Sequence, residues 1–252
     1  MGTVVVSRGY SGTIDGEARE EDEHLPTSAI QGTRTRPAAH AVEFGSSLDR
    51  LVVRSFDVIG ALVLSLLFLP VLIGCALLVK MTSRGPVLHR SPRLATGSGQ
   101  FDALKFRSMV ADGNTVLEEH FAMFPEARAA YERDMKLADD PRVTAVGRWL
   151  RRLSLDELPQ LWNILRGEMS LVGPRPKLPN ERELYGNALE LVLSVKPGLT
   201  GLWQVSGRSS LSYEQRIALD VAYVRERTLL GDIAICVRTA GQLLQPDGDE
   251  AH

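Results

Sequence analysis

Two adjacent carboxylates, Asp156 and Glu157, lie in the run 151–160, between a pair of arginines and a proline. Further along, the run 173–176 reads Gly-Pro-Arg-Pro, a rigid turn that carries the guanidinium of Arg175. Guanidinium groups bind phosphate oxygens in pairs, and a carboxylate can hold a divalent metal ion or attack phosphorus. The residue types and their spacing therefore indicate phosphate chemistry.

The same carboxylates have a plainer interpretation, because Ser154 and Glu157 have the spacing of a helix capping box. Pro159 weakens that interpretation. In a helix capped by Ser154 its ring would clash with the Leu155 carbonyl, whereas a helix that begins at Pro159 avoids the clash. The carboxylates would then precede a helix N-terminus, where backbone N–H groups favour anions. From spacing alone, a phosphate or metal site and a plain cap both remain open.

An apolar run from Val58 to Val79 contains no charged residue. As a helix it is long enough to cross the roughly 30 Å hydrocarbon layer, which favours a membrane element over a buried core helix. Pro70 falls in its middle. Basic residues flank both of its ends: Arg50, Arg54, Lys80 and Arg84. A proline bend with positive charge on both sides fits a re-entrant helix that enters and leaves on one face, and a single-pass helix is the alternative.

The composition fits one domain of ordinary size plus a tail and a membrane element, since the chain has 252 residues. A formal net charge of -2 argues against nucleic acid as the main partner, although arginines gather around the paired carboxylates. The two cysteines, Cys75 and Cys236, lie in apolar runs without metal or disulfide spacing, which fits a reducing compartment. Residues 1–45 are mostly polar and aperiodic, which predicts a disordered tail.

Residues 86–109 have the pattern of a short β-hairpin that turns at the glycines of the run 97–99. In its second strand, alternation places Lys105 and Arg107 on one face. Two cations on one strand face either meet a phosphate or form an ordinary solvated surface, and the strand alone does not decide between these.

The rest of the chain is mostly helical by the spacing of its apolar residues. Helices are predicted over residues 112–137, with a break near Pro125, and over 143–153, 181–195, 213–227 and 233–244. Asp220 lies beside the inward stripe of the helix 213–227, as a structural buried carboxylate or as a functional one. The last helix has an apolar face that either completes the core or lies on lipid.

Four motifs, taken in order, resemble the bacterial sugar transferase family. These are the monotopic polyprenyl-phosphate phosphoglycosyltransferases that begin capsule, exopolysaccharide and O-antigen assembly. The motifs are Lys105-Phe106-Arg107-Ser108-Met109, Ser154-Leu155-Asp156-Glu157-Leu158-Pro159-Gln160, Gly173-Pro174-Arg175-Pro176 and Lys196-Pro197-Gly198-Leu199-Thr200-Gly201. The resemblance covers about Arg54 to Leu244. It implies a small form of the enzyme, without the four extra membrane helices of many members, on the cytoplasmic face of the bacterial plasma membrane.

The resemblance also implies roles for individual residues. Asp156 would attack the β-phosphate of a UDP-sugar, giving a covalent phosphosugar-aspartate and UMP, and polyprenyl phosphate would then take up the sugar phosphate. Glu157 would hold Mg²⁺. Contacts with phosphate or substrate are implied for Lys105, Arg151, Arg175, Arg208 and Asp220. The chain departs from the family pattern where Leu69 precedes Pro70 in place of serine, and where Lys177 stands in place of a common glutamate.

We therefore predict an α+β, predominantly helical, membrane-anchored monotopic protein with a re-entrant helix broken at Pro70 and a small β-hairpin. The predicted parts are a tail over 1–45, the re-entrant helix over 46–85, a catalytic domain over 86–245 and a frayed tail over 246–252. The expected partners are a UDP-sugar, polyprenyl phosphate and membrane lipid, and a homo-oligomer is left open. The rival hypothesis is a non-catalytic, single-pass membrane module that keeps this domain to bind a partner.

Overall fold

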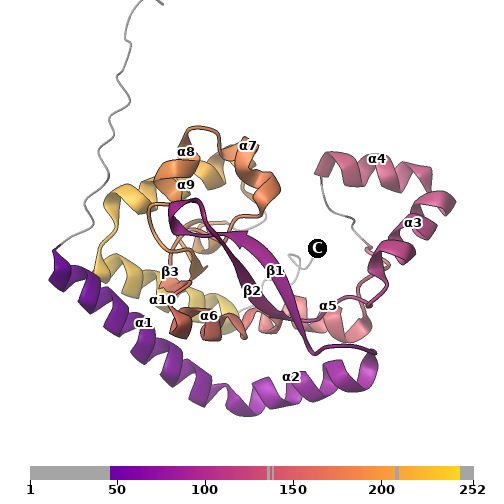
Figure 1. The fold of residues 1–252 in the computed structure, drawn as a ribbon, viewed down its shortest axis with the longest axis horizontal. Coiled ribbons are helices and arrows are strands. Elements are labelled where there is room, and N and C mark those ends of the chain that lie inside the picture. The colour runs from indigo at the N-terminus through magenta and orange to yellow at the C-terminus, as the bar shows by residue number, and fades with distance from the viewer. Residues whose placement is uncertain (1–45, 135–136, 138, 208–209, 245–252) are drawn as a thin grey trace, which may run out of the picture. The chain divides into compact units, whose positions relative to one another are not determined.

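The computed structural model describes residues 46–134, 137, 139–207 and 210–244. The helices are α1 (Ser47–Leu67), α2 (Leu69–Thr82), α3 (Gly113–Met123), α4 (Pro125–Asp134), α5 (Ala145–Arg152), α6 (Gln160–Arg166), α7 (Arg182–Tyr185), α8 (Ala188–Val192), α9 (Tyr213–Glu226) and α10 (Leu229–Leu244). The strands are β1 (Leu88–Leu94), β2 (Gln100–Phe106), β3 (Ser170–Val172) and β4 (Gly198–Thr200). Short 3-10 turns are η1 (Thr96–Ser98), η2 (Leu155–Glu157), η3 (Pro179–Glu181) and η4 (Trp203–Val205). The described part is thus mostly helical with two small strand pairs, which confirms the α+β prediction (Figure 1).

The helices α1 and α2 form one apolar element that bends by 64° where they meet. Within the described residues, no helix by itself is long and apolar enough to cross a membrane, but this bent pair is when its two arms are taken together. Pro70 lies in the first turn of α2, where its missing N–H costs no helical hydrogen bond. The helix is therefore broken beside Pro70, at Phe68, as the mid-run proline predicts.

Two polar residues of α1 attach this element to the rest of the fold. The buried carboxylate of Asp57 accepts hydrogen bonds from the Ser170 hydroxyl at 2.7 Å and from the Leu171 N–H at 2.8 Å. Arg54 donates to two carbonyls in the last turn of α6, at 2.6 and 2.8 Å. The Ile164 carbonyl also accepts from the N–H of Gly167, which caps the helix, so Arg54 adds a second donor at the end of α6. The apolar element is thereby held against both α6 and β3.

The strands β1 and β2 form the predicted antiparallel hairpin, with Leu88 opposite Phe106 and Leu94 opposite Gln100. Asn163 of α6 bonds the free edge of β2, because its side chain accepts from the Leu104 N–H at 3.0 Å and donates to the Asp102 carbonyl at 2.8 Å. The amide thus gives this strand edge the partners that a third strand would supply. It fixes the middle of α6 beside the second strand of the hairpin.

Arg107 follows Phe106, the last residue of β2, and its backbone N–H donates to the Val87 carbonyl at 2.9 Å. The Arg107 guanidinium donates to the Ser83 carbonyl at 2.9 Å and to the Ser83 hydroxyl at 2.7 Å, just after α2. A cation at the end of a helix satisfies its carbonyls and its dipole. The idea that Arg107 lies beside Lys105 to meet a phosphate is therefore wrong, and its contact is with the apolar element.

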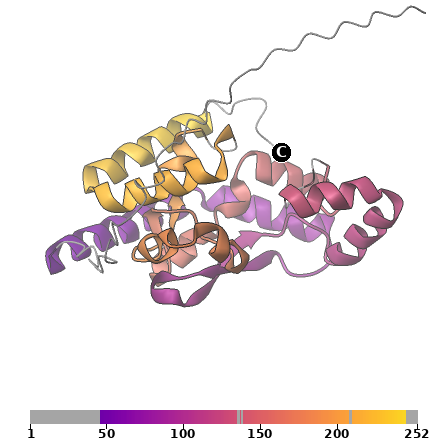
Figure 2. The ribbon, with the colours of Figure 1, turned by 90° about the horizontal axis from the view of Figure 1, so that it is seen from above.

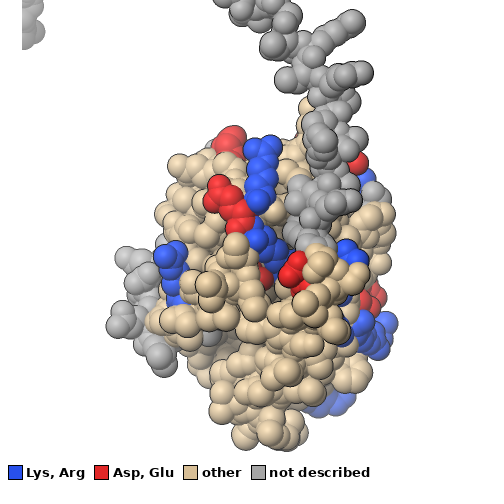
Figure 3. Space-filling model, turned by 90° about the vertical axis from the view of Figure 1, so that its left-hand side faces the viewer, with Lys and Arg blue, Asp and Glu red and all other residues tan. Residues whose placement is uncertain are grey.

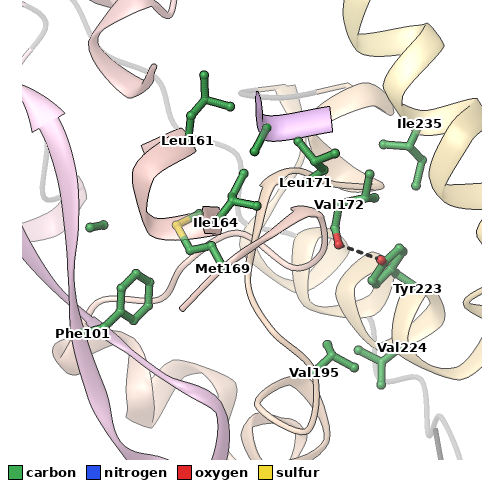
Figure 4. Packing of buried hydrophobic residues seen from close by; sticks show 12 residues of the cluster. Phe101, Leu161, Ile164, Met169, Leu171, Val172, Val195, Tyr223, Val224 and Ile235 are labelled. Carbon is green, nitrogen blue, oxygen red and sulfur yellow. Dashed lines mark hydrogen bonds between the residues drawn. The ribbon is translucent and has the colours of Figure 1, made fainter. Parts of the chain in front are cut away.

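The main core joins α1, α6, the β3–β4 pair, α9 and α10 (Figure 4). Ile164 and Val172 are almost fully buried there, and Tyr223 donates a hydrogen bond from its hydroxyl to the Val172 carbonyl at 3.0 Å. The helices α3 and α4 lie apart from α9 and α10 in both ribbon views (Figures 1 and 2). The core therefore includes α6, which follows the paired carboxylates in sequence, and β3, which directly precedes the Gly-Pro-Arg-Pro run.

One predicted helix is wrong. The segment 181–195 does not form a single helix but breaks into α7 and α8 at Gly186, whose φ of 46° lies in the left-handed region that glycine tolerates. Leu184 is 59% exposed, whereas Tyr185 and Leu189 are buried. The break rotates the two halves relative to each other, so one helical period cannot describe both.

The parallel pair β3–β4 was not predicted, since residues 196–198 have the pattern of a helix-ending turn. Ser170 lies opposite Gly198 and Val172 opposite Thr200. Three-residue strands show almost no alternation, so hydrophobic period does not detect them.

The predicted apolar face of α10 does not complete the core. Ile233 is 40% exposed and Val237 is 67% exposed, while Asp232 and Ile235 face inward. The structure therefore contradicts the interpretation that this face completes the core. The interpretation that it lies on lipid stays open.

Candidate active site

Asp156 and Glu157 lie in η2, the short turn between α5 and α6. The Ser154 side chain makes no capping hydrogen bond, and Pro159 directly precedes α6 instead of beginning it. Ser154 has a φ of 55° and is the one described non-glycine residue with positive φ. Such a backbone costs on the order of 1 kcal/mol and tends to occur at functional sites. The plain capping box is therefore absent, and the turn presents the two carboxylates differently.

Glu157 is the carboxylate with fixed partners. Its Oε1 accepts from Lys105 Nζ at 2.6 Å and from an Arg175 terminal nitrogen at 3.0 Å. Burial by itself would raise the pKa of Glu157, but the charges and hydrogen bonds of Arg175 and Lys105 outweigh it and lower the pKa to about 2. Glu157 is thus ionised throughout the physiological range and already binds cations.

Asp156 has a different environment. The residue is 8% exposed, and burial raises the pKa of its carboxyl, with the Glu157 charge adding to the effect and Lys105 opposing it. A carboxylate that is weakly compensated and only slightly solvated is more reactive than one held in two ion pairs. Asp156 therefore has the properties expected of a nucleophile, and Glu157 has those of a group that binds cations.

Arg151 lies in the last turn of α5, where its Nε donates to the Ser108 hydroxyl at 2.9 Å. Its charge also acts on the Asp156 carboxyl and opposes the rise in pKa that burial causes. The structure thus gathers Lys105, Arg151 and Arg175 around the two acids, as the sequence predicts. Arg208 lies outside the described residues.

Asp220 belongs to a separate, closed cluster. Its Oδ2 accepts from Lys177 Nζ at 2.7 Å and from the Tyr185 hydroxyl at 2.8 Å. The side chains of Lys177 and Asp220 are only 5% and 1% exposed. The prediction that Asp220 contacts substrate is not supported by this geometry, because a buried lysine already occupies its carboxylate. Of the two roles left open for Asp220, the structural one fits.

The loop that carries Arg175 is positioned by close backbone packing. The Gly173 N–H donates to the Thr200 carbonyl at 2.9 Å, and the Gly198 N–H donates to the Pro174 carbonyl at 2.9 Å. A side chain at Gly198 or Gly201 would collide with the Gly173 backbone. Glycine is thus required where these two backbones meet, and the contact holds the Arg175 loop against β4.

The described residues contain no group of three or more His, Cys, Asp or Glu side chains placed to hold a metal ion. The adjacent oxygen ligands of Asp156 and Glu157 fit Mg²⁺ in another way. This ion usually binds one or two carboxylates together with substrate phosphates and retains several waters. The residues present therefore suit a metal that arrives with a phosphate ligand.

Sequence reasoning missed Arg93 as a site residue. Arg93 lines a small hollow together with Ala103, Lys105, Glu157, Gln160, Arg175 and Pro176. The available signal was the hairpin itself, because alternation in β1 places Arg93 and His89 on one face and His89 lies opposite Lys105.

A second groove, of about 710 Å³, lies against the other face of β2 and is lined by Leu104, Phe106, Trp162 and residues of α2 and β1.

Two acids surrounded by lysine and arginine make a site that handles phosphate groups. The sequence model of the family described as "Bacterial sugar transferase" matches residues 48–246. This match covers most of the chain, including every predicted site residue, and the chain therefore belongs to the bacterial sugar transferase family.

Several characterised proteins are similar to this chain. The UDP-galactose-lipid carrier transferase of Erwinia amylovora is 47% identical over 202 residues, which are 79% of this chain and 42% of that protein. The exopolysaccharide production protein ExoY of Rhizobium meliloti is 49% identical over 186 residues, covering 74% of this chain and 82% of that protein. The UDP-glucose:undecaprenyl-phosphate glucose-1-phosphate transferase of Caulobacter vibrioides is 38% identical over 217 residues, covering 81% of this chain and 75% of that protein. The chain thus spans less than half of the first relative and most of the other two.

Proposed function

We propose that this protein transfers a sugar 1-phosphate from a UDP-sugar to polyprenyl phosphate, as the first membrane step in making an exopolysaccharide, capsule or O-antigen. The observation that carries the proposal is the unequal pair in η2, where Glu157 is held by Lys105 and Arg175 while Asp156 is not. The names of the relatives support the substrate classes, since they specify UDP-galactose in one case and UDP-glucose with undecaprenyl phosphate in another.

A lipid acceptor agrees with the apolar element. Exposed apolar side chains occur along both arms of the bent pair, among them Leu62, Leu66, Ile73 and Leu77. In the face drawn in Figure 3, charges of both signs gather above, and the lower part, where α1 and α2 lie in Figure 1, is largely uncharged. We infer a re-entrant helix that enters and leaves the cytoplasmic face of the plasma membrane, since basic residues flank both arms.

In the first step of the proposed reaction, a carboxylate oxygen of Asp156 attacks the β-phosphorus of the donor. A P–O bond forms, and the bond from the β-phosphorus to the bridging oxygen breaks, so UMP leaves with that oxygen. In the second step an oxygen of polyprenyl phosphate attacks the same phosphorus and the Asp156 oxygen leaves as a carboxylate. The covalent intermediate lets two anionic substrates use one site in turn.

The surrounding residues make these steps electrostatically feasible. Lys105, Arg175 and Arg151 offset the repulsion between an anionic nucleophile and a diphosphate. Glu157, with Asp156 beside it, would hold Mg²⁺, which when bound neutralises charge on the phosphate oxygens. The raised pKa of Asp156 keeps a larger fraction of this carboxyl protonated in mild acid than an ordinary aspartate, so the first step requires a pH above that pKa.

The test uses the purified full-length chain, radiolabelled UDP-glucose, UDP-galactose and related donors, and undecaprenyl phosphate. We expect sugar-dependent UMP release and a lipid-linked product, both reduced at least about a thousandfold in Asp156→Asn. Without acceptor, the wild type should release up to one UMP per protein and gain the mass of a sugar phosphate on Asp156. Turnover that survives in Asp156→Asn would exclude this nucleophile.

The rival hypothesis, a non-catalytic binding module, predicts no UMP release with any donor in the panel. Membrane topology is tested by labelling a single cysteine near residue 40 and another near residue 110. In the re-entrant arrangement both react with an impermeant reagent from the same side of the membrane. Labelling from opposite sides would contradict it and would favour a single-pass helix.

A further inference from the structure

A small hollow lies between the hairpin, η2 and the Arg175 loop, next to the Glu157 carboxylate. Its volume of about 10 Å³ is near the lower limit for a single water molecule. The hollow therefore has room for one ligand oxygen and not for a whole phosphate group. Its lining combines cationic, acidic and polar side chains: Arg93, Lys105, Glu157, Gln160 and Arg175.

Arg93 enters this lining from β1, the outer strand of the hairpin. One terminal nitrogen of its guanidinium donates to the Pro176 carbonyl at 3.0 Å, so the group is held in place. Its Nε is buried and has no hydrogen-bond partner among the described residues. Unpaired buried donors are rare because each loses its water without gaining an acceptor, so this N–H calls for an acceptor that the described part of the chain does not supply.

Positive charge exceeds negative charge around the hollow. Arg93, Lys105 and Arg175 contribute three cations and Glu157 is the one acid in the lining, while Arg151 and Asp156, which act on each other beside it, add one charge of each sign. The nearby Glu181, whose carboxylate accepts hydrogen bonds from the Leu178 N–H and the Tyr213 hydroxyl, also acts on Arg93 and reduces the positive excess by one charge without removing it. A multiply charged anion with several oxygens balances this excess better than a carboxylate does.

We propose that Arg93 is a further phosphate-binding residue of the site, which holds one oxygen of the donor diphosphate in the hollow together with Lys105 and Arg175. This inference rests on the proposed function, because it takes the donor to be a nucleoside diphosphate sugar. A tetrahedral phosphate suits the geometry, since one of its oxygens enters the hollow while the others stay outside, toward Asp156. Arg93 would also link ligand binding to the Arg175 loop through the Pro176 carbonyl.

The experiment measures the binding of UDP and of inorganic diphosphate to the full-length chain in detergent, at several salt concentrations. Arg93→Met is compared with Arg90→Met, which changes the same residue type on the opposite face of the same strand, where the side chain is 76% exposed. We expect Arg93→Met to weaken both ligands about tenfold and to reduce the dependence of binding on salt, because one ligand-facing charge is lost. Arg90→Met should leave both properties unchanged.

Arg93→Lys separates ligand binding from simple support of the Arg175 loop. Lysine keeps the charge but cannot reproduce the guanidinium fork, so it should recover most of the salt dependence and part of the affinity. Unchanged UDP affinity in Arg93→Met would overturn the proposal. A loss of affinity with an unchanged salt dependence, equal in the Met and Lys variants, would also overturn it. Failure of the proposed function is distinguishable, because UMP release is measured separately and UDP binding requires no turnover.

Discussion

Arg175 and Lys177 are two positions apart in one loop, yet they pair with different carboxylates in very different surroundings. Lys177 meets Asp220 in a closed pair whose side chains are 5% and 1% exposed. Arg175, with a side chain that is 36% exposed, shares Glu157 with Lys105. The first cluster is electrically complete, whereas in the second three cations, Lys105, Arg151 and Arg175, surround two acids, Asp156 and Glu157. We conclude that the Lys177–Asp220 pair supports the loop and that the Glu157 cluster is available to a ligand.

The largest expected effect tests the closed pair. Lys177→Met leaves the Asp220 carboxylate buried without its cation, which should lower the free energy of unfolding by about 3 to 5 kcal/mol. The measurement is urea denaturation of the detergent-solubilised protein. Adding Asp220→Asn to Lys177→Met should recover at least half of the loss, because the unpaired charge is removed. If Lys177→Met abolishes activity at unchanged stability, the conclusion that Lys177 only supports the loop is wrong.

Acid should weaken the open cluster in a defined pH range. The folded pKa of Glu157, about 2, lies below its ordinary value of 4.5. Its contribution to stability is therefore fully present above about pH 4.5 and is lost as the pH falls toward 2. By linkage it amounts to about 3 kcal/mol. The difference in unfolding free energy between wild type and Glu157→Gln, measured by denaturation from pH 6 to pH 2, should shrink by that amount. A constant difference would contradict the ionised state of Glu157.

Glu157→Gln should affect activity more than it affects the fold of the loop. The amide oxygen still accepts from Lys105 and Arg175, but it binds a metal ion poorly and leaves the cations unbalanced. We expect UMP release to fall about a hundredfold, with a smaller dependence on added Mg²⁺. The matched control is Asp220→Asn, for which we expect near-normal turnover by the folded fraction. Equal loss of turnover in both variants would remove the distinction between the clusters.

The smallest expected effect concerns the backbone of η2. Ser154 adopts a φ of 55°, which glycine tolerates without strain. Ser154→Gly should therefore raise the free energy of unfolding by about 0.5 to 1 kcal/mol, measured by urea denaturation. A Ser154→Ala variant, which keeps a side chain and loses only the hydroxyl, should not gain stability. Equal stabilisation by both substitutions would show that the hydroxyl, and not the backbone, carries the cost.

Local patterns were enough to predict much of the fold. Apolar spacing located α3, α4, α5 and α9 closely, and glycines marked the hairpin turn. The uninterrupted apolar run and Pro70 predicted the broken helix α1–α2. Adjacent acids near arginines indicated the site, because those residues are close in sequence as well as in space.

What could not be predicted depends on contacts between distant segments. The Lys177–Asp220 pair joins residues 43 positions apart, and no local period reports it. Arg93 is part of the site only because the hairpin, the Arg175 loop and η2 pack together in the folded chain. Gly186 breaks a segment whose apolar spacing is otherwise helical, because its φ of 46° is left-handed, which apolar spacing does not report.

The hairpin has a consequence for how its length can vary. Alternate residues of β2 serve two different places: Ala103 and Lys105 line the hollow beside Glu157, whereas Leu104 and Phe106 line the large groove. Inserting or deleting one residue between the turn and Lys105 would shift the strand register and exchange these faces, sending the lysine into the groove and a leucine or phenylalanine toward the phosphate. A change of two residues would preserve the alternation. Variation in the length of this hairpin is therefore constrained to even steps, unless a bulge absorbs the odd one.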